Sequence, residues 1–163
     1  MKFTHLKKNK EIKMVDISKK KNTQREARAG ARVKFSTQTF KKVVLDDSPK
    51  GTIFNTAALA ATMAAKKTQE LIPLCHNINL SSVDIDFKII KKDCEVEVIS
   101  IVKSNTKTGV EMEALTACTI AALTIYDMCK SFDKKIIIND IKLLFKSGGK
   151  SGNYEDDNIY PSS

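Results

Sequence analysis

The longest apolar stretch of the chain runs from Met112 to Cys129 and has charged residues only near its two ends. Nearly every position is Ala, Leu, Ile, Met, Cys, Tyr or Thr, so no polar stripe is left for solvent. The pattern predicts a helix that is covered on all sides. Glu113 and Asp127 lie fourteen residues apart, which is about 21 Å along a helix axis. Either the two ends serve different sites, or one site is completed by the opposite helix end of another subunit.

Alternation of apolar and polar positions with a period of two predicts four strands. They cover 31–35, 83–89, 94–98 and 136–145, the last interrupted near Asn139 and Asp140. An Ala-rich segment that ends in two lysines predicts a second long helix. The other expected elements are that helix over 56–67, a helical turn near 39–44, and turns at 46–51 and 91–93.

The order of these elements is strand, helix, strand, strand, helix, strand. That order predicts an α+β fold, the ferredoxin-like split βαβ sandwich, with an antiparallel sheet and two main helices on one face. The other face of the sheet must be exposed to solvent or covered by a partner. Because the helix over 112–129 is so apolar, burial beyond one subunit is expected, and the chain should form homo-oligomers.

The chain has 163 residues, of which 42% are hydrophobic, and carries a net charge of +9. This length is enough for one domain with a sizeable core. We expect a basic, partly mobile arm over 1–24, a single domain over 25–152 and a disordered tail over 153–163. Residues 1–22 hold eight lysines against Glu11 and Asp16, so most of the net charge lies on the arm. A solvated arm is favoured over a nucleic-acid-binding surface, since such a surface needs basic residues on the folded domain.

The four cysteines form no CxxC pair, and three of them lie inside apolar runs. They are typical of buried thiols in a reducing compartment, which favours a cytoplasmic protein. Cys75 and His76 are adjacent, but no second pair stands at ligand spacing, so no metal site is expected. No uninterrupted apolar run reaches the ~18 residues that span a bilayer, so no membrane segment is expected either.

Several ionisable residues could carry chemistry, and each has an ordinary structural alternative. His76 lies on an irregular segment around Pro73 and could transfer a proton near neutral pH, although a lone loop histidine is usually structural. Asp127 and Lys130 are three apart on the long helix, which fits either a functional pair or a surface ion pair. Glu111 and Glu113 are favoured at a helix N-terminus whether or not they bind anything.

The segment 147–152, SGGKSG, invites a nucleotide-binding interpretation. The spacing of a P-loop would require glycine at position 144, which is Leu144, so that interpretation fails. A glycine-rich turn can still present backbone amides to an anion, and Lys146 and Lys150 add positive charge. A plain flexible loop is the alternative.

Taken together, several stretches closely resemble the cyclic pyranopterin monophosphate synthase family of molybdenum cofactor biosynthesis. They are Met14–Asp16, Arg25–Ala27, Lys50–Gly51, LIPLCH at 71–76, KTGVEMEALTA at 107–117, ALTIYDMCK at 122–130 and KSGGKSG at 146–152. The two longest strings are highly specific, and the matches span most of 14–152. The sequence departs from the family at Asn77, where Pro is common.

The resemblance implies a lyase that converts 3′,8-cyclo-7,8-dihydro-GTP into cyclic pyranopterin monophosphate and releases pyrophosphate. It implies neither a metal nor another cofactor. It implies a ferredoxin-like subunit in a homohexamer, a trimer of dimers, with the site at the dimer interface. The substrate would come from an upstream radical SAM enzyme, and no nucleic-acid or membrane partner is expected.

The resemblance also assigns roles to residues. Asp127 and Lys130 would be the general acid and base, with Lys50 as a third catalytic residue that helps to neutralise the phosphates. Substrate binding would fall to Leu74, Cys75, His76, Glu111, Met112, Glu113, Arg25 and Lys146.

Two other classes of protein remain as alternatives. A nucleic-acid or nucleotide-binding module could use the basic arm, but the chain has ten aromatic residues, no Trp and no RNP-like motif. A structural oligomer without a site would tolerate the loss of both Asp127 and Lys130.

Overall fold

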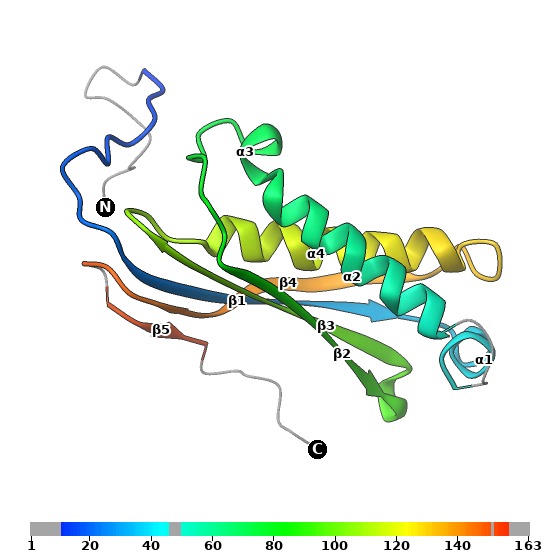
Figure 1. Ribbon diagram of the computed structural model, residues 1–163. Coiled ribbons are helices and arrows are strands. Elements are labelled where there is room, and N and C mark those ends of the chain that lie inside the picture. The colour runs from blue at the N-terminus through cyan, green and yellow to red at the C-terminus, as the bar shows by residue number, and fades with distance from the viewer. Residues whose placement is uncertain (1–10, 46–49, 151, 157–163) are drawn as a thin grey trace.

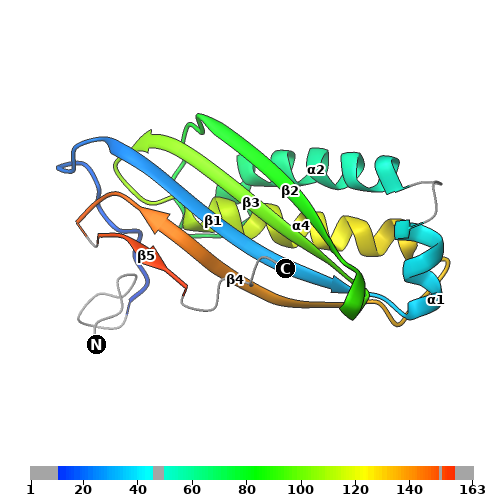
Figure 2. The same ribbon diagram turned by 90° about the horizontal axis from the view of Figure 1, so that it is seen from below.

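Five strands form one antiparallel sheet, and two long helices cover one of its faces in the computed structural model (Figures 1 and 2). The structure describes residues 11–45, 50–150 and 152–156, without the side chains of 45 and 50. The strands are β1 (Thr23–Lys34), β2 (Ser82–Ile90), β3 (Glu95–Thr106), β4 (Ile137–Ser147) and β5 (Tyr154–Glu155). The helical elements are α1 (Thr37–Phe40), the π-turn η1 (Lys41–Leu45), α2 (Lys50–Lys66), α3 (Thr68–Leu71), the 3₁₀ turn η2 (Lys91–Asp93) and α4 (Glu111–Cys129).

The order of strands across the sheet is β2-β3-β1-β4-β5, and every neighbouring pair is antiparallel. Because β3 lies between β1 and β2, the unit that contains α2 is a split βαβ motif. The predicted ferredoxin-like sandwich is therefore confirmed. The predicted hairpin is also confirmed, since η2 joins β2 to β3.

Two elements begin earlier than their patterns predict. β1 starts at Thr23 rather than at Ala31, and α2 starts at Lys50 rather than at Thr56. In β1 the inward positions before Val33 are Ala27, Ala29 and Ala31, all with zero exposure. Alanine has little preference for strands, and its alternation with charged residues gives a weak signal. Pairing along the whole of β3 overrides that local preference.

The interruption predicted in the last strand is present. Asp140 has φ = 52°, and the pairing of β1 with β4 shifts register between Gly30 and Arg32. A bulge of this kind bends the strand while both flanking segments stay paired. The helical turn predicted near 39–44 is also present as α1 and η1, whereas most of the turn predicted at 46–51 lies outside the described residues.

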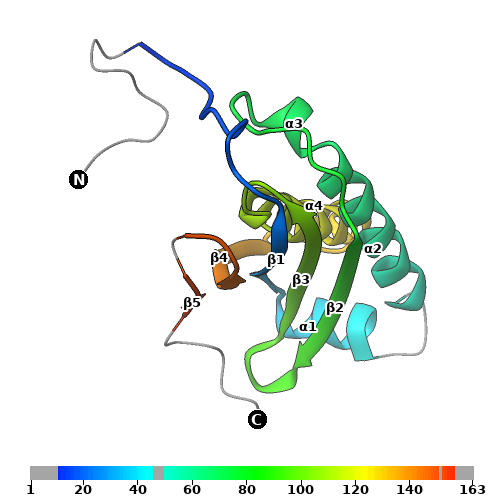
Figure 3. The same cartoon turned by 60° about the vertical axis from the view of Figure 1, so that its left-hand side comes forward.

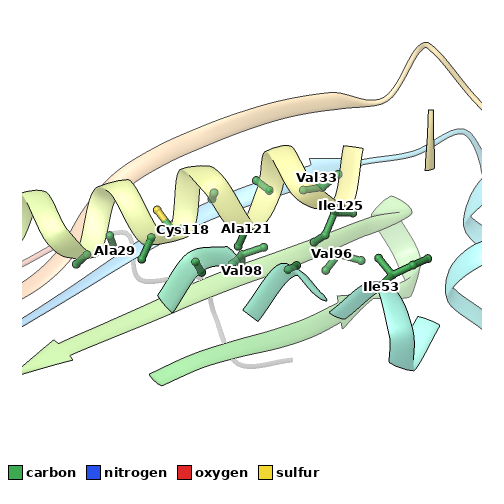
Figure 4. Packing of buried hydrophobic residues seen from close by; sticks show 14 of the residues in the cluster. Ala29, Val33, Ile53, Val96, Val98, Cys118, Ala121 and Ile125 are labelled. Atoms are coloured by element: carbon green, nitrogen blue, oxygen red, sulfur yellow. The ribbon is translucent and has the colours of Figure 1, made fainter. Parts of the chain in front are cut away.

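The core lies between the sheet and the two long helices, as the side chains in Figure 4 show. α4 contacts α2, β1, β3 and β4. Small residues make this close packing possible. The buried positions of α2 include Ala57, Ala61 and Ala65, and those of α4 include Ala114, Ala117, Ala121 and Ala122.

The prediction that α4 is covered on all sides is wrong for the single chain. Eight of its residues are buried, but Met112 is 37% exposed and Leu123 is 50% exposed. Leu59 and Met63 of α2 are also exposed. By length and composition α4 could cross a membrane, and it is the one such helix in the described part of the chain. Its buried side packs against the sheet as a core helix does, so its apolar character has an explanation within the fold.

The outer face of the sheet, opposite the helices, is less exposed to solvent than the alternating pattern suggests. Glu95 and Glu97 are 5% and 1% exposed, although the period of two places them opposite the helices. Arg32 Nη1 donates to Glu95 Oε2 at 3.2 Å. Burial raises the pKa of the Glu97 carboxyl, and the charge of Arg32 partly opposes that change. Long cationic side chains thus shield carboxylates on this face.

The predicted boundaries of the arm, domain and tail remain predictions. Strand pairing begins at Thr23, inside the range expected for the arm. Tyr154 and Glu155 pair with β4, and the Asp156 N–H donates to the Leu144 carbonyl oxygen at 2.9 Å, inside the range expected for the tail.

Close helix packing predicts that Ala61→Leu lowers the free energy of unfolding by about 1–3 kcal/mol, because three added heavy atoms must enter a filled core. Chemical denaturation would measure the change. Ala60→Leu is the matched control, since this neighbouring position is only half-buried and should change stability by less than about 1 kcal/mol. Equal effects at both positions would contradict the packing described for α2.

Candidate functional site

The start of β1, the end of β3, the start of α4 and the end of β4 lie at the same end of the sheet (Figures 1 and 3). α4 begins after Gly109 and Val110, with Glu111 and Glu113 in its first turn. A Cβ atom on Gly109 would lie 1.8 Å from Glu111 Oε2. Glycine at this position therefore lets the Glu111 carboxylate fold back beside the helix N-terminus, where the helix dipole stabilises negative charge.

Two adjoining cavities open at this end of the molecule. The larger has a volume of about 770 Å³ and the smaller about 520 Å³. Both sizes fit a bound small molecule. Lys20, Thr108, Gly109 and Glu111 line both cavities, so the two form one continuous site. The remaining lining residues are Lys19, Lys21, Thr23, Arg25, Lys107, Gly149 and Lys150 in the larger cavity, and Val15, Leu74, Cys75, His76, Ile78, Met112, Glu113 and Lys146 in the smaller.

The smaller cavity combines apolar, acidic and imidazole groups. After α3 the chain turns, and the Cys75 N–H donates to the Ile72 carbonyl oxygen at 3.1 Å. This turn presents Leu74, Cys75 and His76 to the cavity. His76 Nε2 is buried and has no hydrogen-bond partner among the described residues. A buried ring nitrogen without a partner carries a free-energy cost that a bound ligand could remove.

The Glu113 carboxyl is the buried acidic group of the site. Its residue is 3% exposed, and burial raises its pKa to about 7, with the charge of Glu111 adding to the effect. Burial also raises the pKa of the neighbouring Cys75 thiol, with a further contribution from Glu113. Near neutral pH the Glu113 carboxyl can therefore either accept or donate a proton.

The larger cavity is lined mainly by cations. Arg25 Nε is buried and has no hydrogen-bond partner within the described part of the chain. Gly149 has φ = 81°, and a Cβ atom there would lie 1.8 Å from Arg25 Nη1, so glycine leaves room for the guanidinium group. Lys146 Nζ lies 3.5 Å from Glu111 Oε1 and links the end of β4 to α4. An anion could be held between these cationic groups.

All eight residues predicted to bind substrate lie around this site. The structure brings together Arg25, Leu74, Cys75, His76, Glu111, Met112, Glu113 and Lys146 from four separate stretches of chain.

The three residues predicted to be catalytic do not line it. Asp127 and Lys130 lie at the opposite end of α4, where they form an ion pair at 2.5 Å with side chains 66% and 58% exposed. The hydrogen bond and charge of Asp127 raise the pKa of Lys130. Lys50 begins α2 at that same end (Figure 1), and its side chain lies outside the described part of the structure.

Sequence reasoning missed several residues of the site. Lys19, Lys20 and Lys21 were expected to belong to a solvated arm, yet they line the larger cavity. Lys107 lines it as well. The run of three lysines begins three residues after Asp16 and could have indicated a role, because the Met14–Asp16 motif belongs to the family resemblance.

Among the residues that the structure describes, no three His, Cys, Asp or Glu side chains come together as a metal ion would require. The groups available to a ligand are cations, carboxyls, an imidazole and apolar side chains. The arrangement suits an anionic ligand that carries a partly apolar heterocycle.

The chain matches the model of the MoaC family over residues 14–149. It is 46% identical over 159 residues to a protein of Peptoclostridium acidaminophilum named cyclic pyranopterin monophosphate synthase, and the match covers 98% of this chain and 100% of that protein. A solved structure of the ferredoxin protease FusC, a mutant in complex with Arabidopsis ferredoxin, matches with a TM-score of 0.31 and 13% identity. It covers 66% of this chain and 10% of the FusC chain, and a similarity this low carries no argument.

The buried state of Glu113 predicts a pH-dependent contribution to stability. A carboxyl whose pKa rises from 4.5 to about 7 on folding costs nothing below pH 4.5 and destabilises the fold as the pH rises to about 7. Across this pH range we expect the free energy of unfolding of Glu113→Gln to rise by up to about 3 kcal/mol relative to that of the unchanged chain. Denaturation at several pH values measures the difference. Glu70→Gln, at an exposed position of α3, controls for the loss of one charge. A difference between Glu113→Gln and the unchanged chain that stays flat with pH would contradict the prediction.

Proposed function

The chain belongs to the MoaC family, and we propose on this premise that it is a cyclic pyranopterin monophosphate synthase of molybdenum cofactor biosynthesis. The reaction converts 3′,8-cyclo-7,8-dihydro-GTP into cyclic pyranopterin monophosphate and pyrophosphate. We place it in the lyase class, because pyrophosphate leaves without hydrolysis or a change of oxidation state. The observation that carries the proposal is the joining of a cationic cavity to an acidic and apolar one, in a chain that is 46% identical to a protein of that name.

The guanine-derived ring fits the smaller cavity. Its N–H groups can donate to a carboxylate, and Glu113 and Glu111 supply carboxyls. His76 offers the buried Nε2 that has no partner among the described residues. Leu74 and Met112 add apolar surface against the ring. Rearrangement to a pterin moves protons on and off ring atoms, and a Glu113 carboxyl with a pKa of about 7 can exchange them.

The triphosphate fits the larger cavity. Closing the cyclic phosphate breaks the bond between the α-phosphorus and the oxygen that bridges to the β-phosphate, so negative charge builds on the departing pyrophosphate. Cations that already surround that position stabilise this charge without reorganising. Arg25, Lys107 and Lys150 lie in this cavity, and Lys146 lies beside it.

Asp127, Lys130 and Lys50 would then act from a second subunit. Within one chain Asp127 lies about 21 Å along α4 from Glu113, too far to touch the same ring, and Lys50 begins α2 at the same distant end. The apolar side chains left exposed on α2 and α4, Leu59, Met63 and Leu123, support contact with another copy. We propose a homohexamer, a trimer of dimers, in which one subunit's α4 C-terminus faces its partner's α4 N-terminus.

The substrate and the compartment follow from the same premise. A cyclised GTP has to be made by a radical reaction, so an upstream radical SAM enzyme would supply it. All four cysteines, including buried Cys118 and Cys129, are free thiols, which supports a reducing compartment, the cytoplasm.

We expect Asp127→Asn to lower kcat about 100-fold or more, because general acid–base catalysis commonly contributes that much. The assay supplies cyclised GTP to the purified protein and follows pyrophosphate and pterin formation. Asp93→Asn is the matched control, since it removes an exposed carboxylate from η2 that belongs neither to α4 nor to the lining of the two cavities. Equal rates in Asp127→Asn and the unchanged protein would remove Asp127 from the catalytic residues.

A shared site predicts that two inactive variants restore each other. Glu113→Gln damages one end of α4 and Lys130→Ala the other, so a mixed dimer holds one doubly damaged site and one intact site. Random mixing after co-expression should return about a quarter of the sites to full activity. A site built within a single chain would leave the mixture as inactive as its components.

A further inference from the structure

Residues 15–21, called here the strap, run over the site before the chain enters β1. Val15 and Lys20 line the smaller cavity, and Lys19, Lys20 and Lys21 line the larger one. The strap thus forms part of the wall of both cavities. Its lysines contribute half of the six cationic side chains around the larger cavity.

Local hydrogen bonds give the strap a defined shape. Asp16 Oδ1 accepts a bond from the Ser18 N–H at 2.8 Å, and the Lys20 N–H donates to the Ile17 carbonyl oxygen at 3.1 Å. This Asx motif followed by a turn is a common way for aspartate to fix the backbone. One bond then ties the turn to the site, since Lys107 Nζ donates to the Ser18 carbonyl oxygen at 3.1 Å.

The charge of the larger cavity is not balanced by its own lining. Lys19, Lys20, Lys21, Arg25, Lys107 and Lys150 face a single carboxylate, Glu111. Like charges held this close repel each other, and an anion between them would remove that repulsion. In the smaller cavity the balance is different, because only Lys20 and Lys146 lie beside Glu111 and the Glu113 carboxyl, which is partly ionised near neutral pH. An extended polyanion is therefore attracted to the strap side of the site.

We propose that Lys19 and Lys21 make the site selective for the length of the phosphate chain. They line only the cationic cavity, so they are placed to hold the β- and γ-phosphates that leave as pyrophosphate. Each added phosphate brings further negative charge, and only a chain that reaches the strap gains from these lysines. The identity of the substrate rests on the function proposed above, whereas the preference for longer phosphate chains does not.

Binding of inorganic triphosphate, pyrophosphate and phosphate to the full chain tests the preference directly by calorimetry. The unchanged protein should bind triphosphate most tightly and phosphate least. The double variant Lys19→Gln, Lys21→Gln should lose about tenfold in affinity for triphosphate and progressively less for the shorter anions. Lys91→Gln, Lys92→Gln is the matched control, since it removes two adjacent exposed lysines from η2 at the other end of the sheet. Equal losses for all three anions, or no difference from the control, would overturn the proposal.

Kinetics with cyclised GTP supply the second readout. The strap variant should raise KM about tenfold and leave kcat within about twofold, because Lys19 and Lys21 would bind the phosphates without taking part in the chemistry. A KM equal to that of the control variant would contradict the proposed role of the strap, while the proposed reaction would still stand. If the unchanged protein does not convert cyclised GTP, the proposed function fails, and the anion series still decides whether the strap selects for phosphate length.

Discussion

Close packing of α4 against the sheet and α2 is the constraint on which the rest of the structure depends. Alanines on the buried sides of α2 and α4 let the backbones approach closely, and the inward alanines of β1 leave space for the helix. Since α4 is held along its length, its two ends stay fixed relative to the sheet. The first turn, with Glu111 and Glu113, is thereby held beside the end of β4, where Lys146 pairs with Glu111, and around the same cavity as the turn after α3.

The same packing separates the chemistry of the chain into two ends. Carboxyls, an imidazole and most of the site's cations gather at the α4 N-terminus, while Asp127 and Lys130 form an exposed pair at its C-terminus. A rigid helix cannot bring these ends together. A reaction that uses both therefore requires a second copy of the chain, and the exposed apolar side chains on α2 and α4 offer a surface for it.

Two glycines and one buried carboxyl set the electrostatics at the N-terminal end. Gly109 and Gly149 leave room for the carboxylate of Glu111 and the guanidinium of Arg25, where any side chain would displace them. Burial keeps the pKa of Glu113 near 7. The site therefore places a proton-exchanging group within reach of a cationic cavity, and that combination matches the rearrangement of a ring that carries phosphates.

By itself the sequence determined the order of the elements, since periods of two and 3.6 mark strands and helices wherever one face is buried. Its long motif strings also indicated the family and all eight residues of the cavity lining that we expected to bind substrate. Only the tertiary structure decided the extent of β1, because pairing with β3 outweighs the weak strand preference of alanine. It also decided the pKa of Glu113 and the place of Lys19–Lys21 beside Arg25 and Glu111, since burial and proximity arise from contacts between distant segments and leave no local pattern.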